Sequence, residues 1–475
     1  MREETSAADL DRAHVWHPFT RTDQWLAEEP LVIDRADGCW LIDADGNRYL
    51  DGNSSLWVNL HGHRRRELDD ALRAQLDKVA HATFLGLSNA PAAELAARLV
   101  ELAPRGLEWV FFSESGASAV EVALKMAFAY WRHQGDEERT LFVSMDGAYH
   151  GDTIGSVSVG HIDAFHSAFG PLLFPTRSFA QPYCYRCPLG LTYPSCELAC
   201  ADTLEDVLAA EGDRVAAVVV EPLVQGAAGI ITAPDGHLAR VAEIARRHGA
   251  LLIVDEVATG FGRTGALFAS QLEGVSPDLM AVGKGLTGGY LPMSATLATA
   301  EIFDSFRGPG RTFFHGHSYS GNPLSAAVAL ASLKLLVDEG GLERAQALAE
   351  SLSRELKRFE GVAHVGDIRQ RGLMAGVELV ADVASKAPFP PEWQVGAQVC
   401  RRARDLGLVI RPLGDTIVVM PATTMTAEEL RFLCDTLVQA IDAVTASLAS
   451  PAGAPGTGLP DAGAPATRAP GVGDA

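Results

Sequence analysis

The sequence has little of what a nucleic-acid-binding or membrane-spanning protein requires. Among its 475 residues, 39 are Lys or Arg and 60 are Asp or Glu, so the formal net charge is −21. Phosphate backbones select clustered positive charge, which excludes nucleic acid as a partner. The longest aliphatic runs, such as residues 215–220, are far shorter than the roughly 20 residues of a membrane helix. We therefore expect no membrane partner.

The two ends of the sequence lack other features. The start, MREETSAADLDR, has neither the basic start nor the apolar core of a secretory signal, which predicts a cytoplasmic protein. Residues 449–475 are almost all Pro, Gly, Ala and small polar residues. They offer too little apolar surface to offset the entropy of ordering them, so we predict a disordered tail.

Three short aliphatic stretches organise the middle of the chain, at residues 214–223, 249–257 and 278–286. Continuous apolar runs of this length predict strands that are covered on both faces. Residues 236–249, between the first two, carry apolar residues at helical spacing, so the order is strand, helix, strand. This pattern predicts an α/β fold with a mostly parallel sheet and helices on both faces. From about residue 340 an amphipathic helix and strand-like segments predict a smaller α+β lobe.

The domain organisation follows from length and pattern. The length permits roughly three domains, although α/β enzymes often form two closely packed lobes. Apolar residues make up 47% of the chain and charged residues 21%, the balance of a globular protein with an extensive core. We predict an N-terminal segment of the small lobe and substrate channel over 1–65, a large cofactor-binding domain over 66–335, a C-terminal small domain over 336–448, and the tail over 449–475.

A polar residue follows each of the three predicted strands. These residues are Glu221, Asp255 and Lys284. The carboxyl ends of parallel strands lie at one edge of a sheet, where ligands gather, so we expect one site to hold all three. Burial favours the neutral, nucleophilic form of a lysine, which forms a Schiff base with an aldehyde cofactor. A buried Asp255 needs a cationic partner, either a protonated pyridine nitrogen or, as the structural alternative, Arg263.

Two further stretches carry features of a cofactor site. Residues 110–131 predict a strand, a Ser/Gly-rich turn and a helix, whose free N–H groups would receive an anion such as phosphate. The alternative is a helix that is simply capped by Ser113 or Ser115. Tyr149 lies between glycines in a predicted loop, where it either covers a flat ligand or only packs. Together with the acid and the lysine, these features describe a pyridoxal phosphate site.

Two nucleotide-binding motifs are discounted. Residues 260–265, GFGRTG, match the dinucleotide fingerprint, but two acids precede them and no acid follows at the expected distance. The sequence around Lys284 lacks the first glycine and the Ser or Thr of a P-loop. A nicotinamide dehydrogenase built on residues 260–265 is kept as a remote rival hypothesis.

The segments DEVATGFGRTG, PDLMAVGKG and HGHSYSGNPLSAAVAL resemble the class III, fold-type I pyridoxal phosphate aminotransferases, and the resemblance covers residues 12–445. Within that family, VWHPFT, DGNSSLWVNLHGH, GAYHGDTIGSVSVG and RPLGDTIVVMP resemble the branch that aminates 8-amino-7-oxononanoate in biotin biosynthesis. The resemblance implies the fold-type I transferase fold and ping-pong transamination. Another class III ω-amino acid aminotransferase is the close alternative.

The resemblance also implies cofactor contacts and a homodimer. The implied contacts are Lys284 as the Schiff-base lysine, Asp255 at the pyridine nitrogen, backbone N–H groups of Gly116 and Ala117 at the phosphate, Tyr149 stacked on the ring, Glu221 nearby, and His317 and Ser318 reaching the phosphate of the neighbouring subunit. Because the last two serve the neighbour, the active enzyme is expected to be a homodimer.

Substrate contacts are implied in the same way. Arg411 would pair with the carboxylate of the keto substrate, a task that suits a planar cationic fork. The residues implied to line the channel are Phe19, Leu56, Trp57 and Gly316. Members that use S-adenosylmethionine as amino donor typically carry Tyr, Trp and Tyr at Phe19, Leu56 and Val418, so this chain favours lysine as the donor.

Four of the seven cysteines fall close together. These are Cys184, Cys187, Cys196 and Cys200. Paired thiolates at such spacing indicate structural zinc, and an iron–sulfur centre is the other metal option. Unliganded loop cysteines are the alternative, because transamination needs no metal. A thiol-metal sensor is the matching non-enzyme hypothesis.

Overall fold

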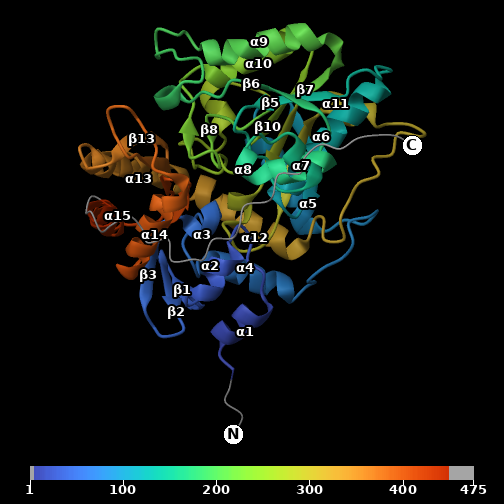
Figure 1. The fold of residues 1–475 in the computed structure, drawn as a ribbon. Coiled ribbons are helices and arrows are strands. Elements are labelled where there is room, and N and C mark those ends of the chain that lie inside the picture. Colours follow the sequence, from blue (N-terminus) through green and yellow to red (C-terminus); the bar gives the residue numbers. More distant parts are fainter. Residues whose placement is uncertain (1–4, 449–475) are drawn as a thin grey trace, which may run out of the picture.

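The structure, a computed structural model, describes residues 5–448, and the predicted tail at 449–475 lies outside the described residues. Its largest sheet runs through the upper part of the molecule (Figure 1). The seven strands, in spatial order, are β4 (Leu107–Ser113), β12 (Ser294–Thr299), β11 (Leu279–Val282), β10 (Leu251–Asp255), β7 (Val215–Val220), β5 (Leu141–Met145) and β6 (Thr176–Phe179). Only β12 runs antiparallel to its neighbours in this sheet. The prediction of a mostly parallel sheet is therefore confirmed.

Helices cover both faces of this sheet because alternate residues of a strand point to opposite sides. Val218 and Val220 of β7 belong to a buried cluster with α9 (Ala199–Glu211) and α10 (His237–Arg247). Ala217 and Val219 belong instead to a cluster with α6 (Gly116–His133). Every residue of β7 is buried, which explains its unbroken aliphatic sequence. Helices on both faces confirm the predicted α/β class.

The predicted helix at 236–249 corresponds to α10, with its apolar side turned to the sheet. Its buried residues include Leu238, Val241, Ala242 and Ala245. The other α-helices before residue 340 are α1 (Ala7–His14), α2 (Thr22–Ala27), α3 (Ser54–Trp57), α4 (Arg66–Leu76), α5 (Ala90–Leu102), α7 (Ile154–Ser158), α8 (Asp163–His166), α11 (Ala300–Ser305) and α12 (Pro323–Leu333). Within residues 5–448, no helix combines the length and apolar character needed to cross a bilayer.

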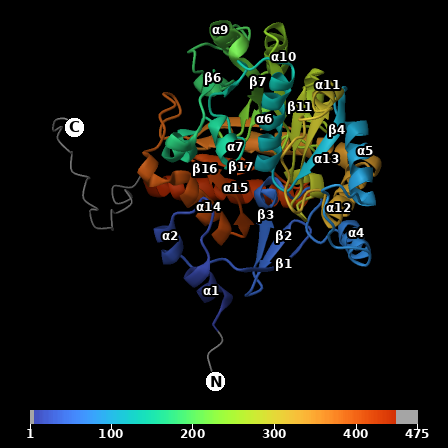
Figure 2. The same ribbon diagram turned by 90° about the vertical axis from the view of Figure 1, so that its right-hand side faces the viewer.

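The two ends of the chain build one layer together. The first sheet of this layer contains β1 (Ile33–Asp37), β2 (Trp40–Asp43), β3 (Arg48–Asp51) and β15 (Leu408–Val409). Because β15 pairs in parallel with β3, segments from the N-terminal and C-terminal parts of the chain are joined in one sheet. Figures 1 and 2 show these blue N-terminal strands beside the orange and red C-terminal elements.

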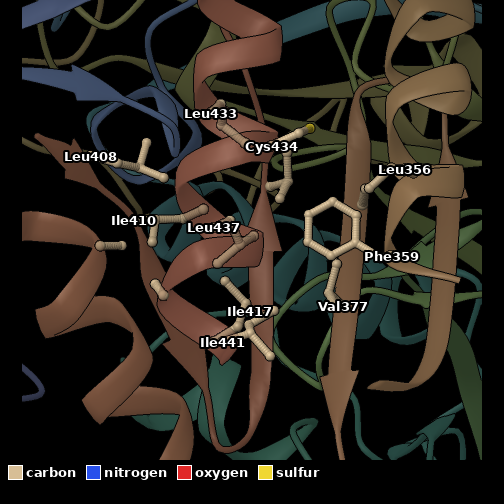
Figure 3. Packing of buried hydrophobic residues seen from close by; sticks show 14 of the residues in the cluster. Leu356, Phe359, Val377, Leu408, Ile410, Ile417, Leu433, Cys434, Leu437 and Ile441 are labelled. Atoms are coloured by element: carbon tan, nitrogen blue, oxygen red, sulfur yellow. The ribbon is translucent and has the colours of Figure 1, made fainter. Parts of the chain in front are cut away.

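The C-terminal elements form the remainder of this layer. They comprise α13 (Gly341–Leu356), β13 (Val365–Arg371), β14 (Met374–Leu379), α14 (Val395–Asp405), β16 (Arg411–Leu413), β17 (Thr416–Val419) and α15 (Ala427–Leu448). Figure 3 shows Leu437 and Ile441 of α15 facing Ile417 of β17 in a buried cluster. Burying one such aliphatic side chain contributes roughly 2 kcal/mol. The predicted boundaries between the lobes stay a prediction.

Candidate active site

Glu221, Asp255 and Lys284 meet at the carboxyl edge of the large sheet, as their positions after the strands predict. Asp255 is the last residue of β10 and stands in register with Ala281 of the parallel strand β11. Lys284 follows β11 by two residues, and Glu221 directly follows β7. All three line a cavity of about 420 Å³, referred to below as the larger cavity.

Lys284 stands at the wall of the larger cavity with its amine on an aromatic face. The Nζ atom lies 5.3 Å from the centroid of the Trp57 ring. Burial lowers the pKa of Lys284, although the negative charges of Asp255 and Glu221 oppose this effect. A lowered pKa increases the share of neutral amine, which is the nucleophilic form.

Asp255 is paired with a histidine rather than with Arg263. Its Oδ2 lies 2.8 Å from Nδ1 of His150, and its Oδ1 accepts a 3.0 Å hydrogen bond from the backbone N–H of Val257. Arg263 is used elsewhere, because its Nη atoms donate to the carbonyls of Pro421 and Asn59. The structural alternative for Asp255 is therefore wrong. Burial lowers the pKa of His150, but the hydrogen bond and charge of Asp255 outweigh it, so the pKa is raised.

Tyr149 and Glu221, which both line the larger cavity, are hydrogen-bonded to each other. The Tyr149 backbone N–H donates to Oε1 of Glu221 at 3.2 Å, and its hydroxyl donates to Asp152 at 2.8 Å. Burial raises the pKa of Glu221 to about 7, because little solvent reaches its carboxylate. The Tyr149 ring lines the cavity wall, which is the placement that a stacking role requires.

The start of helix α6 also borders the larger cavity. Helix α6 begins at Gly116, and the Ser115 side chain accepts a hydrogen bond from the Ser118 N–H. Of the two serines predicted as caps, Ser115 therefore caps the helix. A Cβ atom on Gly116 would lie 2.5 Å from Cγ1 of Val257, which leaves room only for glycine. Ser115, Gly116 and Ala117 all line the cavity. Free N–H groups at such a helix start bind phosphate.

These residues fit pyridoxal phosphate. A nucleophilic amine, a carboxylate, an aromatic ring and a helix N-terminus border one cavity. Nε2 of His150 is buried and has no hydrogen-bond partner among residues 5–448, so the cavity still offers a polar contact. Lys284 would hold the aldehyde, Asp255 the pyridine nitrogen, and Gly116 and Ala117 the phosphate.

A smaller cavity of about 140 Å³ adjoins the first and shares Trp57, Tyr149, Ala227 and Lys284 with it. Four residues that the sequence predicted for the substrate line it, namely Phe19, Leu56, Trp57 and Arg411. Its walls also include Asn53, Phe165, Ala227, Leu413 and Val418, of which only Val418 was singled out from the sequence. Phe165 lacks any motif that would have indicated it, because it reaches the cavity from a helix of four residues.

Three predicted residues lie away from both cavities of their own subunit. Nδ1 of His317 pairs with the carboxylate of Glu114, and both His317 and Ser318 are exposed. The nearest atom to a Cβ on Gly316 belongs to Leu85. The proposed roles of His317 and Ser318 thus depend on a second subunit, and Gly316 does not line its own channel.

The four clustered cysteines border one small cavity but do not form a metal centre. Among the residues that the structure describes, no three or more His, Cys, Asp or Glu side chains are arranged to hold a metal ion. All four are free thiols, and burial raises the pKa of Cys200 to about 11. The zinc or iron–sulfur prediction is therefore corrected, because closeness in sequence did not bring the sulfurs into coordination geometry.

Comparison with known proteins defines the class. The Aminotransferase class-III family profile matches residues 23–441. The chain belongs to this family, and it is a pyridoxal phosphate-dependent transaminase. Residues 260–265 form turns after β10 rather than the start of a helix, so the dehydrogenase reading of this motif is wrong.

Individual relatives show which members of this family the chain is similar to. The adenosylmethionine-8-amino-7-oxononanoate aminotransferase of Geobacter sulfurreducens is 52% identical, over 92% of this chain and 97% of that protein. The crystal structure of the Methanocaldococcus jannaschii protein of the same name has a TM-score of 0.88 at 40% identity, covering 92% and 98% of the chains. An (S)-enantioselective ω-transaminase from Thermomicrobium roseum has a TM-score of 0.87 at 41% identity, covering 93% and 98%.

Proposed function

We propose that this transaminase converts 8-amino-7-oxononanoate to 7,8-diaminononanoate in biotin biosynthesis. One observation carries the proposal: Lys284 and Arg411 border the same mainly apolar cavity. A ketone near the lysine and a carboxylate at the arginine would be joined by an aliphatic chain. The names of the relatives at up to 52% identity support the same substrate.

The residues of the chain account for the proton and charge steps. When bound, pyridoxal phosphate carries the amino group and takes up electrons from the substrate carbon. Lys284 would be displaced by the donor amine, and its Nζ would then move the proton between substrate and cofactor carbons. The Asp255 carboxylate, fixed by His150, would keep the pyridine nitrogen protonated.

Recognition of the keto acid would combine one charge with apolar contact. The guanidinium of Arg411 lies 5.9 Å from the centroid of the Phe19 ring, which places a cation beside an aromatic wall. A planar guanidinium binds a carboxylate through two parallel hydrogen bonds. Phe165 packs edge-on to Phe19, with 5.4 Å between the ring centroids, and extends the apolar wall.

The amino donor is proposed to be lysine, with S-adenosylmethionine as the alternative. Phe19, Leu56 and Val418 all border the smaller cavity, and none carries a hydroxyl group. A sulfonium donor with an adenine ring would gain from hydroxyl and larger aromatic contacts at these positions. Lysine offers a carboxylate to Arg411 and methylene groups to the apolar wall.

The functional unit is proposed to be a cytoplasmic homodimer in which His317 and Ser318 of one subunit contact the phosphate in the other. Both residues are exposed, and neither lines a cavity of its own subunit, which supports this arrangement. Light scattering gives the oligomeric state. Mixed dimers of Lys284→Ala and His317→Ala subunits test sharing, because one of the two sites then regains both residues.

Product formation with each donor tests the proposed function. Purified enzyme is incubated with 8-amino-7-oxononanoate and either lysine or S-adenosylmethionine, and 7,8-diaminononanoate is measured by mass spectrometry. Product with lysine alone is the expected result. Turnover of ω-amino acids without any 7,8-diaminononanoate would instead assign a different class III activity.

A further inference from the structure

The tip of a short hairpin forms part of the active-site wall. Strands β8 (Val224–Gln225) and β9 (Ile231–Thr232) pair antiparallel, and residues 226–230, called the tip turn below, connect them. Ala227 of the tip turn borders both cavities. The Gly226 N–H donates to Oε2 of Glu221 at 2.8 Å. Any displacement of the tip turn would therefore change the space around cofactor and substrate.

The tip turn does not hold its own shape by favourable backbone geometry. Ile230 has φ of +56°, a left-handed conformation that β-branched residues rarely adopt. The Gly229 and Ile230 N–H groups both donate to the Gly226 carbonyl, at 3.2 and 3.0 Å. Such strain persists only where contacts impose it, and a partner outside the turn adds to the contacts within it.

Arg369 of β13 is that partner. Its Nε lies 3.0 Å from both the Gly229 and Ile230 carbonyl oxygens, and its Nη2 lies 2.6 Å from the Gly229 oxygen. The side chain is only 6% exposed, so these bonds are shielded from competing water. The planar fork reaches two adjacent carbonyls at once, which an ammonium group does not reproduce.

The charge of Arg369 is balanced within the same cluster. Nη1 donates to Asp367 at 2.7 Å and to Glu378 at 2.6 Å. Glu378 also accepts from the Tyr183 hydroxyl and from Arg186 at 2.8 Å. Two arginines and two carboxylates thus neutralise one another, and the segment that contains the clustered cysteines supplies Tyr183 and Arg186. Balanced partners keep the guanidinium in place, because a lone buried charge would be costly.

We propose that Arg369 is a positioning residue of the active site: it fixes the strained tip turn so that Ala227 and Glu221 keep their places beside cofactor and substrate. Arg369 touches neither cavity itself. It acts on the cavities through its hydrogen bonds to the Gly229 and Ile230 carbonyls of the tip turn. A Cβ on Gly226 would lie 3.0 Å from the Trp57 ring, so the turn also packs against the ring that the Lys284 amine contacts.

The test compares Arg369→Lys with Arg371→Lys in the holoenzyme. Arg371 lies on the same strand but pairs with Asp235 at 2.7 Å, away from the tip turn. For Arg369→Lys we expect the KM of the keto acceptor to rise about tenfold with a smaller change in kcat, as for a misplaced binding wall. The visible circular dichroism of the bound cofactor should change as well. Arg371→Lys should match the wild type in both measurements.

A lowered thermal midpoint with unchanged KM and dichroism in Arg369→Lys would overturn the proposal, because the role would then be only structural. A double variant, Arg369→Met with Glu378→Gln, removes opposite charges together and guards against loss of the fold. It should show the same KM and dichroism changes. Failure of both variants to fold would also count against a local positioning role.

The choice of keto acceptor rests on the proposed function. If wild-type enzyme does not aminate 8-amino-7-oxononanoate, the proposed function fails while the dichroism still reports on Arg369. The KM of any acceptor that wild-type enzyme does use then replaces the first measurement. The two failures are therefore distinguishable.

Discussion

Nδ1 of His150 lies 2.8 Å from Oδ2 of Asp255, and the two side chains are almost completely buried. A carboxylate that accepts a hydrogen bond is stabilised in its ionised form. The hydrogen bond therefore fixes the Asp255 carboxylate in the position from which it would contact the pyridine nitrogen of a bound cofactor.

Replacement of this histidine should weaken catalysis without abolishing it. In His150→Asn, Asp255 loses a charge-assisted hydrogen bond, and we expect kcat to fall about tenfold. The pH dependence of kcat should also shift, because the pyridine nitrogen of the bound cofactor would be less fully protonated. His248→Asn, which removes a contact to the surface residue Glu205, serves as the control. Wild-type kcat and pH profile in His150→Asn would contradict the assigned role.

Loss of Lys284 should remove covalent cofactor binding. In Lys284→Ala we expect no borohydride-stable cofactor adduct, and kcat/KM should fall by more than about a thousandfold because nucleophile and proton carrier are one group. Mass spectrometry of the reduced protein and steady-state kinetics measure both. Lys357→Ala, at a residue outside both cavities, should retain the adduct. An adduct that persists in Lys284→Ala would locate the Schiff base elsewhere.

Arg411→Lys should affect substrate binding more than chemistry. An ammonium keeps the charge but loses the bidentate fork, so we expect the KM of the keto acid to rise about tenfold with kcat less affected. Arg401→Lys, on α14 and 3.7 Å from Glu28, is the matched control. Equal KM values in the two variants would show that Arg411 does not bind the carboxylate.

The raised pKa of Glu221 predicts a pH-dependent stability of the apoprotein. Between the ordinary value of 4.5 and about 7, the folded state binds more protons at this group than the unfolded state does. Its contribution to the free energy of unfolding therefore falls as pH rises through that window and is constant above it. The Glu221→Gln variant has no titrating group at this position and does not lose this stability. Its free energy of unfolding relative to the wild type should therefore rise by about 2 kcal/mol from pH 5 to pH 8.

Urea unfolding of both apoproteins at one subunit concentration measures the difference. A constant difference between the two proteins across this range would mean that Glu221 titrates normally in the folded state. Glu243→Gln, on the exposed side of α10, should show no comparable trend.

The clustered cysteines should be dispensable for metal content and activity. We expect purified enzyme to contain no stoichiometric zinc or iron, and Cys184→Ser with Cys187→Ser to keep kcat within about twofold, because surface substitutions away from a site change little. Elemental analysis and kinetics measure these outcomes. Stoichiometric metal that is lost in the double variant would restore the rejected prediction.

Much of the site was predictable because it depends on local sequence. The runs before Asp255 and Lys284 are aliphatic since both faces of each strand are buried, and a parallel sheet brings the ends of its strands to one edge. The start of α6 was likewise visible from its Ser/Gly turn. A resemblance to a known family then indicated Arg411 and Phe19, which carry no local pattern of their own.

Other features depend on which distant segments meet. Asp255 had two candidate partners in sequence terms, and the structure pairs it with His150, 105 positions away, while the Nη atoms of Arg263 donate to backbone carbonyls. The four cysteines satisfied a spacing rule, yet their sulfurs are not arranged around an ion. Arg369 reaches the tip turn across 140 positions of sequence.

The sequence by itself thus determined the strands, the helix starts and the residues at their ends, because hydrophobic periodicity and backbone preference act over a few residues. Only the tertiary structure decided the partner of each buried charge and the support of the strained turn. Those pairings are set by how whole layers pack, since a buried polar group is stabilised by whichever partner the fold brings within hydrogen-bond distance.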